Sequence, residues 1–512
     1  MSCLAVALVI GSMAALYTAL SDIAVQSGAT QSQLTWIVDG YTLAVACLVL
    51  PAGAVGDRYG RRGVLIAGLI VFATASAVPL ALDDPLSLIA ARTVSGAGAA
   101  LVMPSTLSIL TGEFPAGERG RAVGLWAGVA ASGAVVGVLL SGVLLEFWSW
   151  KAIFVALTAA ALILLAASWL VPESRQHSHP RIDVAGSVII AIAIGLIVVG
   201  LIEAPQRGWT DGAVVALFGI GAFGVLTFVA VELRTSDPLL DMRLFTDRGF
   251  SAGTVSLVLH FLVMFGVFYL LVQYLQLICG YAPLVSALAL TPLIVPIVGV
   301  SLAAPRLANQ WGLRMMAVSG LVAIAVGTLL VSGLDVNSGY IEVVCALLAF
   351  GVGLGLCTAP STAAVVDATP VEKHGVAAAV NDAARELGAA IGVAIAGSLL
   401  AAGYSDRVKP VVAALPAPAQ AAFSDSLASA TQAAHRLGPP LQPAIASAKT
   451  AFVHGCTMGA IVLAAVCGLS AVIVAILAPG RPAKALNGQG GYPNPTAIDH
   501  HSRDLSTEIG QP

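Results

Sequence analysis

The chain has 512 residues, of which 58% are hydrophobic and only 10% are charged, and its mean hydropathy is +0.93. A soluble globular protein needs a charged surface, so this composition excludes that class and predicts a polytopic membrane protein. The formal net charge of −3 gives no electrostatic reason to expect nucleic-acid binding.

Continuous apolar stretches of about 20 residues follow one another along the chain, the length that a helix needs to cross a bilayer. Membrane barrels would show shorter segments of alternating hydrophobicity. We therefore predict an all-α polytopic membrane protein with fourteen transmembrane helices, near residues 4–25, 36–56, 64–82, 86–110, 121–145, 150–171, 183–203, 212–232, 250–275, 284–304, 315–333, 339–364, 374–401 and 451–478.

Basic residues test this segmentation, because short cytoplasmic loops of membrane proteins are enriched in Lys and Arg. If the N-terminus lies inside, the alternate gaps and the C-terminal tail carry most of the 24 Lys and Arg, and only Arg92 and Arg385 fall within spans. The pattern predicts a multi-pass protein of the cell membrane, inner or plasma, with both termini in the cytoplasm.

Two segments fall outside the predicted helices. Residues 402–450 are rich in Ala, Pro, Ser and Gln and predict an extracellular loop with a surface helix around 417–437. Residues 479–512 have the polar, Gly- and Pro-rich composition of a disordered cytoplasmic tail.

Signatures of other function classes do not stand out in the sequence. The seven cysteines lie in or beside apolar runs without CxxC spacing, which favours small buried hydrophobes over a disulfide or metal framework. A Gly-x4-Gly-Lys-Ser/Thr phosphate loop is missing, which disfavours ATP-driven transport. We expect no enzyme activity, no metal site and no cofactor apart from the proton as coupling ion.

Internal repetition indicates a duplicated helix bundle. The loop at residues 53–62 recurs in weaker form at 305–314, and Pro104-Ser105-Thr106 recurs as Pro360-Ser361-Thr362. The offsets of 252 and 256 residues are close to half the chain. Two halves that rock about a site near the midplane are the simplest explanation.

Several motifs carry a family resemblance. The loop from Gly53 to Arg62 is similar to the motif between the second and third helices of the major facilitator superfamily, and residues 88–100 resemble its fourth-helix motif with an intramembrane arginine. The fourteen spans, residues 34–43, Gly280 to Pro283 and the thirteenth helix resemble the fourteen-helix drug:proton antiporter branch.

This resemblance implies two pseudo-symmetric six-helix bundles and an extra linking pair of helices. It divides the chain into an N-terminal bundle (1–171), linking helices 7 and 8 with flanking loops (172–249), a C-terminal bundle (250–478) and the tail. Two positions depart from the branch. Tyr17 stands where an early aspartate is usual, and the fifth helix has Gly137-Val138 and Ser141-Gly142 in place of Gly-Pro and Gly-Gly, which predicts a helix without the proline kink.

Carboxylates within spans are candidates for binding protons or substrate charge, because a buried charge is costly. Asp39 begins helix 2, and Asp22 could replace the acid lost at position 17. Asp382 and Glu386 flank Arg385 on helix 13, at spacings that place Asp382 on the same face as both. Each position also has a purely structural explanation. Asp39 could be a helix-start carboxylate, Asp22 an interfacial residue, and Asp382, Arg385 and Glu386 an internally paired cluster.

Arg92 lies near the middle of helix 4, where it should meet backbone carbonyls or a carboxylate and either gate proton access or crosslink helices structurally. His260 is more simply explained as a hydrogen-bonded packing residue than as a coupling group. We expect the loop residues to exchange salt bridges between inward and outward states, in addition to setting topology; they are Gly53, Asp57, Arg58, Gly60, Arg61 and Arg62.

Aromatic and amide side chains could line a cavity for flat, lipophilic cations, although most membrane aromatics pack or anchor at interfaces. The candidates are Tyr17, Trp36, Tyr41, Trp126, Phe265, Tyr269, Gln273 and Gln276.

The sequence thus predicts a proton-coupled exporter of lipophilic, often cationic drugs or toxic compounds that works as a monomer in the lipid bilayer by alternating access. Export of an endogenous metabolite or lipid is the alternative within transport. A non-transporting, transporter-like receptor is the alternative outside it.

Overall fold

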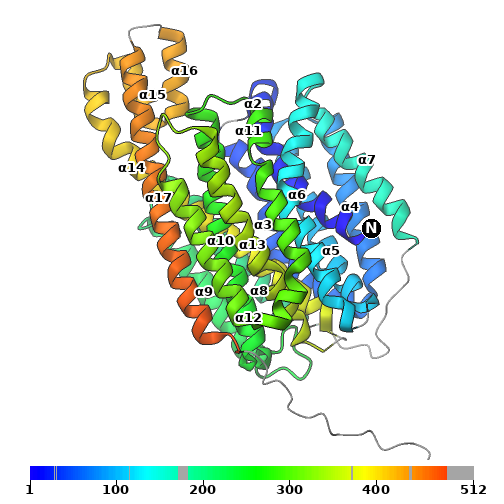
Figure 1. The fold of residues 1–512 in the computed structure, drawn as a ribbon. Coiled ribbons are helices and arrows are strands. Elements are labelled where there is room, and N and C mark those ends of the chain that lie inside the picture. Colours follow the sequence, from blue (N-terminus) through cyan, green and yellow to red (C-terminus); the bar gives the residue numbers. More distant parts are fainter. Residues whose placement is uncertain are drawn as a thin grey trace, which may run out of the picture.

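The computed structural model describes residues 1–27, 29, 31–114, 116–170, 183–370, 373–437 and 441–480. Helices dominate this part of the chain (Figure 1), and no strand occurs within it. The helices are α1 (Ser2–Ala15), α2 (Leu20–Ser27), α3 (Gln31–Tyr59), α4 (Arg61–Ala81), α5 (Pro85–Glu113), α6 (Ala116–Phe147), α7 (Lys151–Ser168), α8 (Val184–Arg207), α9 (Gly212–Glu232), α10 (Arg248–Leu277), α11 (Pro283–Ala289), α12 (Ile294–Ser332), α13 (Tyr340–Asp367), α14 (His374–Ala413), α15 (Ala417–Asp425), α16 (Leu427–Leu437) and α17 (Gln442–Leu477); the 3₁₀ turns are η1 (Leu16–Thr18), η2 (Met242–Thr246) and η3 (Thr291–Leu293).

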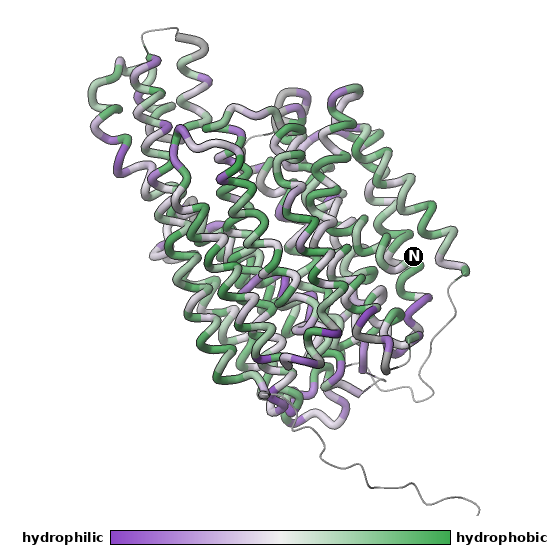
Figure 2. Tube along the Cα trace, viewed as in Figure 1, coloured by the Kyte–Doolittle hydropathy of each residue, from purple (hydrophilic) through white to green (hydrophobic). Residues whose placement is uncertain are grey.

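The helices are long and apolar enough for a polytopic membrane protein, as predicted. Within the described residues, thirteen segments are long and apolar enough to cross a bilayer, and Ser2–Thr18 is a shorter apolar helical stretch. In Figure 2 hydrophobic colour covers most of the length of the peripheral helices, and hydrophilic colour gathers mainly at the two ends of the bundle. This distribution fits helices whose middle parts face hydrocarbon.

The structure corrects the first predicted span. Residues 4–25 do not form one helix, because the chain leaves α1 at the 3₁₀ turn η1 and resumes as the short helix α2. In the C-terminal half the predicted span 284–304 is likewise divided among α11, η3 and the start of α12. Hydropathy is averaged over a whole span, so it does not reveal a local turn inside an apolar stretch.

The segment predicted as a loop at 402–450 is mostly helical. α14 continues to Ala413, α17 begins at Gln442, and α15 and α16 lie between them as the projection at the upper left of Figure 1. Apolar side chains give this projection a small core of its own, since Phe423, Leu427 and Ala430 are all at most 1% exposed. The Tyr404 hydroxyl donates to the Phe423 carbonyl at 2.9 Å and ties the projection to α14.

Helices of each half pack mainly against one another. One buried apolar cluster draws most of its residues from 5–164, and the other draws most of its residues from 228–478. α8 and α9 pair with each other, and α8 also packs against both α3 and α14. The linking pair therefore covers part of the seam between the halves; the predicted domain boundaries stay predictions.

The internal repeat is visible in the backbone. Gly60 and Gly312 both have positive φ, of 102° and 76°, and each ends one transmembrane helix as the next begins. A side chain at such a φ would be strained, so glycine is required at both turns. Pro104 and Pro360, the second repeated pair, lie within α5 and α13.

Candidate functional site

A cavity of about 220 Å³ lies between the two halves of the molecule. Its walls come from α1 and α6 on one side and from α10 and α11 on the other. Five of the eight predicted cavity residues line it: Tyr17, Phe265, Tyr269, Gln273 and Gln276. Most of the other lining residues are apolar, and the Gln273 Nε2 donor has no hydrogen-bond partner among the described residues.

A second, much smaller chamber of about 20 Å³ adjoins this cavity. The two share walls, including Met13, Met264 and Phe265. Trp126 lines the chamber, together with polar residues of α13 and α14: Thr358, Thr362, Asn381, Arg385 and Glu386. A space of this size holds about one water molecule or one small polar group.

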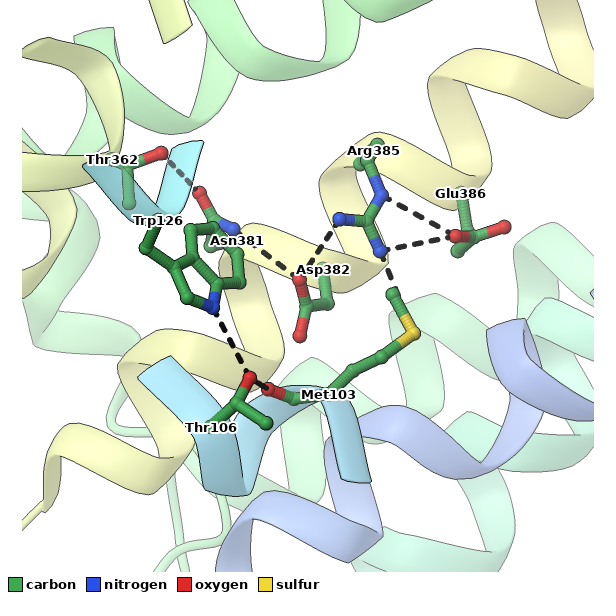
Figure 3. Close-up of polar contacts among 8 residues, drawn as sticks. All are labelled: Met103, Thr106, Trp126, Thr362, Asn381, Asp382, Arg385 and Glu386. Carbon is green, nitrogen blue, oxygen red and sulfur yellow. Dashed lines mark hydrogen bonds and ion pairs between the residues drawn. The ribbon is translucent and has the colours of Figure 1, made fainter. Parts of the chain in front are cut away.

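Two carboxylates compete for one guanidinium beside the chamber (Figure 3). Arg385 NH1 lies 3.4 Å from Asp382 Oδ1, and Arg385 NH2 lies 3.2 Å from Glu386 Oε1. All three residues are at most 5% exposed. Asp382 Oδ2 and Glu386 Oε2 have no hydrogen-bond partner among the described residues. The cluster thus has a formal negative charge when both acids are ionised, and protonation of one acid would neutralise it.

Neutral polar groups extend the cluster into the neighbouring helices (Figure 3). Asn381 Nδ2 lies 3.4 Å from Asp382 Oδ1, and the Thr362 hydroxyl donates to Asn381 Oδ1 at 2.8 Å. Trp126 Nε1 donates to the Thr106 hydroxyl at 3.1 Å. Residues from α5, α6, α13 and α14 therefore meet at one polar layer inside an apolar bundle.

Asp39 lies on α3 and is half-buried. Its carboxylate has no hydrogen bond or ion pair among the described residues. It interacts electrostatically with Tyr17 and Tyr269, which line the larger cavity. Asp22 is exposed on α2, and neither Asp22 nor Asp39 lines one of the two cavities. The structure brings Asp39 near the cavity but does not bring Asp22 to it.

Arg92 crosslinks three helices of the N-terminal half. The guanidinium donates to the Ser12 hydroxyl at 3.0 Å and to the carbonyls of Ser12 and Ile37 at 3.3 and 3.4 Å. Its carbon lies 4.2 Å from the centre of the Tyr41 ring, and the Tyr41 hydroxyl donates to the Val9 carbonyl. Tyr41 is therefore a partner of Arg92 and lines neither cavity described above, nor does Trp36.

The last turn of α3 connects the two halves through Asp57. Asp57 accepts hydrogen bonds from the backbone N–H groups of Gly375 and Val376 at 3.0 and 3.1 Å, at the start of α14. Arg61 pairs with the same carboxylate at 3.1 Å and donates to the Ser108 carbonyl. A carboxylate at a helix N-terminus interacts favourably with unpaired N–H groups and the helix dipole.

The neighbouring basic residues of this loop have different surroundings. Arg62 donates to the Trp169 carbonyl at 3.0 Å and stacks on that ring, and Arg58 lies over the ring of Tyr59. Gly53 allows close contact between the halves, because a Cβ there would overlap the Gly375 carbonyl and the Ala379 side chain. Asp57 and Gly53 thus hold this end of the bundle shut.

The family of the chain follows from its sequence matches. A sequence profile for the Major Facilitator Superfamily matches residues 2–393. The chain belongs to the major facilitator superfamily. The predicted family and fold class are confirmed: this is a multi-pass membrane protein of a transporter family.

Named relatives in the superfamily include drug resistance proteins. The chain is 32% identical to the multidrug resistance protein Stp of Mycobacterium tuberculosis, over 78% of the chain and 75% of the relative. It is 30% identical to the multidrug efflux pump LfrA of Mycolicibacterium smegmatis, over 86% and 88%. The crystal structure of the human organic anion transporter MFSD10 matches with a TM-score of 0.60 at 14% identity, covering 92% of this chain and 97% of that one. At that identity the likeness shows the fold alone.

Sequence reasoning missed Thr358, which contacts His260. His260 is fully buried on α10, and its Nδ1 and Nε2 contact the Ser256 carbonyl at 2.6 Å and the Thr358 hydroxyl at 3.2 Å. This agrees with a hydrogen-bonded packing residue. The nearby Pro360-Ser361-Thr362 repeat marked the region in sequence, but nothing there indicated which hydroxyls face the chamber.

Proposed function

We propose that this superfamily member exports lipophilic, often cationic compounds in exchange for protons, by alternating access between its two halves. The observation that carries the proposal is a largely apolar, aromatic-lined cavity between the halves, directly beside a buried cluster in which Asp382 and Glu386 share one arginine. The cavity supplies surface for flat apolar molecules. The cluster supplies a carboxylate that can alternate between a proton and a substrate cation.

Three further features support this proposal. Tyr17 and Tyr269 offer aromatic faces to a cation, and each such contact is worth about 0.5–2 kcal/mol. The bonds of Asp57 to the start of α14 provide a contact that alternating access must break. The relatives Stp and LfrA are named as a multidrug resistance protein and a multidrug efflux pump.

The same proposal places the protein in the plasma membrane with both termini in the cytoplasm, acting as a monomer with the proton as its coupling ion. In that orientation the Asp57 end of the bundle faces the cytoplasm and the α15–α16 projection faces outward. The basic residues of the short loops support this orientation.

Ethidium accumulation in cells tests the proposal. Cells that express the wild type should accumulate less ethidium than empty-vector cells, and a protonophore should abolish the difference. Glu386→Gln and Asp39→Asn should abolish it at equal protein level, whereas Asp22→Asn, at an exposed site outside the cavity, should not. Equal accumulation in wild-type and empty-vector cells would reject efflux of this dye class. Export of an endogenous metabolite, or a role as a non-transporting receptor, would then be the better explanation.

A further inference from the structure

The small chamber beside Glu386 presents hydrogen-bond acceptors, and most of the donors around it already have acceptors within the protein. Thr358 shows how this arises. Because the Ser256 carbonyl can only accept, His260 Nδ1 must carry a proton and donate to it at 2.6 Å. The ring is fully buried, and no ion pair with an acidic side chain is found for it among the described residues, so a second proton on the ring is disfavoured. Nε2 is then an acceptor, and the Thr358 hydroxyl donates its proton to it, away from the chamber.

The Thr362 hydroxyl is also oriented as a donor toward the protein, by Asn381. The Asn381 amide places its Nδ2 group toward the Asp382 carboxylate, so its Oδ1 faces the Thr362 hydroxyl. An ionised carboxylate can only accept, which sets this orientation of the amide. The Thr362 hydroxyl therefore donates to Asn381, and its oxygen keeps lone pairs for another donor.

Most of the other donors at the chamber have acceptors within the protein. Trp126 Nε1 donates to Thr106, whose own hydroxyl donates to the Met103 carbonyl at 2.7 Å. Each nitrogen of the Arg385 guanidinium already contacts Asp382, Glu386 or the Met103 sulfur. Glu386 Oε2, by contrast, is a buried acceptor with no hydrogen-bond partner among the described residues, on a side chain only 4% exposed.

We infer that the chamber is a binding site for one hydrogen-bond-donating cationic group, and that Thr358, Thr362 and Glu386 supply its acceptors. Its volume of about 20 Å³ admits a group the size of a water molecule and excludes a bulky drug body, which the adjoining cavity of about 220 Å³ can hold. The donor can be the N–H of a protonated amine substrate or a hydronium ion. A quaternary ammonium group has no N–H to donate and is too large for the chamber.

His260 has a defined part in this site as a positioning residue, because it holds the proton of Thr358 away from the chamber. Asn381 does the same for Thr362. This inference rests on the proposed transport function and adds a substrate preference to it: protonated amines should be favoured over their N-methylated quaternary analogues.

Purified protein in proteoliposomes with a pH gradient provides the test. A lipophilic tertiary amine, protonated at the assay pH, and its N-methyl quaternary derivative are compared by the concentrations that half-inhibit efflux of a fluorescent substrate. Wild type should favour the amine by about tenfold, the size expected for one hydrogen bond to a charged group. Thr358→Val and His260→Phe should bring the ratio close to one, while Thr358→Ser should keep it.

Thr328→Val is the matched control, because Thr328 is equally buried and its hydroxyl donates only within α12. If hydronium is the occupant, the amine and its analogue should inhibit equally. In that case the pH of half-maximal transport should shift by about one unit in Thr358→Val and not in the control. The inference is overturned if neither the ratio nor the pH profile of Thr358→Val differs from the control. If the wild type moves no substrate in response to the gradient, the proposed function fails instead.

Discussion

Replacement of Asp57 by Asn should open the end of the bundle that this residue holds shut. Asp57 is 7% exposed, and its two oxygens accept from the N–H groups of Gly375 and Val376 and from Arg61. An asparagine of the same size retains one acceptor oxygen and loses the charge. Hydrogen bonds to a charged group contribute about 1.5–3 kcal/mol, and the helix dipole adds to this.

We therefore expect Asp57→Asn to destabilise the closed arrangement by about 2 kcal/mol, which changes the ratio of closed to open molecules by about thirtyfold. Electron–electron double resonance between spin labels at Phe114 and Met315 measures this ratio. Both positions are exposed, at 41% and 58%, and they lie at the same end of the bundle in opposite halves. The wild type should give a single short distance, and the variant should add a longer one.

Asp247→Asn is a matched control. Asp247 also accepts from two backbone N–H groups at the start of a helix, at 2.8 and 2.9 Å, but that helix is α10, which follows it directly in the chain. Loss of this cap should leave the distance between the halves unchanged. The reasoning is refuted if Asp57→Asn gives the wild-type distances, or if Asp247→Asn produces the same longer distance.

Three other substitutions test the remaining contacts. Arg92→Lys should lower the apparent thermal midpoint of the purified protein by roughly 2–4 °C, because an ammonium cannot reproduce the planar fork that spans three acceptors and an aromatic ring; an unchanged midpoint would contradict the crosslinking role. Gly137→Ala should destabilise the protein by about 1–3 kcal/mol, because the added Cβ would overlap the Gly11 backbone. Gly63→Ala is the control and should be neutral in the same thermal assay, because a Cβ at Gly63 meets nothing within 4 Å. Tyr269→Ala should weaken binding of an aromatic cation to the purified protein about tenfold, measured by fluorescence titration, and wild-type affinity would exclude this ring from the cation site.

Hydropathy and motifs predicted the helices and the repeat because membrane spans carry a strong one-dimensional signal. The cluster on α14 could also be predicted from the sequence, since i, i+3 and i, i+4 spacings place Asp382, Arg385 and Glu386 together on any helix. The rotation of a helix about its axis was harder to predict. α3 is surrounded by other helices, so its apolar pattern does not define one inner face, and Tyr41 turned out to contact Arg92 and not the cavity.

The hydrogen-bond polarity of the small chamber could not be predicted from sequence at all. It depends on Thr358 meeting His260, which lies 98 residues away, and on a backbone carbonyl that fixes the tautomer of the histidine. A hydroxyl group can donate or accept, and only its tertiary partners decide which. The sequence indicated which side chains were polar, and the fold determined what they can bind.

The structure relates the two sequence differences from the antiporter branch, in helix 1 and in helix 5. α6 runs unbroken from Ala116 to Phe147, as the missing proline predicts, and the break occurs in the first helix at η1 instead. There the Ala15 carbonyl lies within hydrogen-bond distance of the hydroxyls of Thr18 and Ser141, at 2.9 and 2.6 Å, and the two hydroxyl oxygens lie 2.6 Å apart.

Ser141 stands where the fifth-helix motif has the first glycine of its Gly-Gly pair. Its hydroxyl lies within hydrogen-bond distance of the Ala15 carbonyl at the 3₁₀ turn, where the Ala19 N–H bonds to Leu16 and not to Ala15. The side chain of α6 thus supplies a polar partner at the break, where a bilayer offers none. Four residues earlier, Gly137 packs directly on Gly11, so α1 and α6 touch backbone to backbone below the break. Because Thr18 and Tyr17 both line the large cavity, the break is placed where a bound molecule would contact it. The interruption that a proline kink would introduce in the fifth helix is thus found in the first helix, at the wall of the cavity.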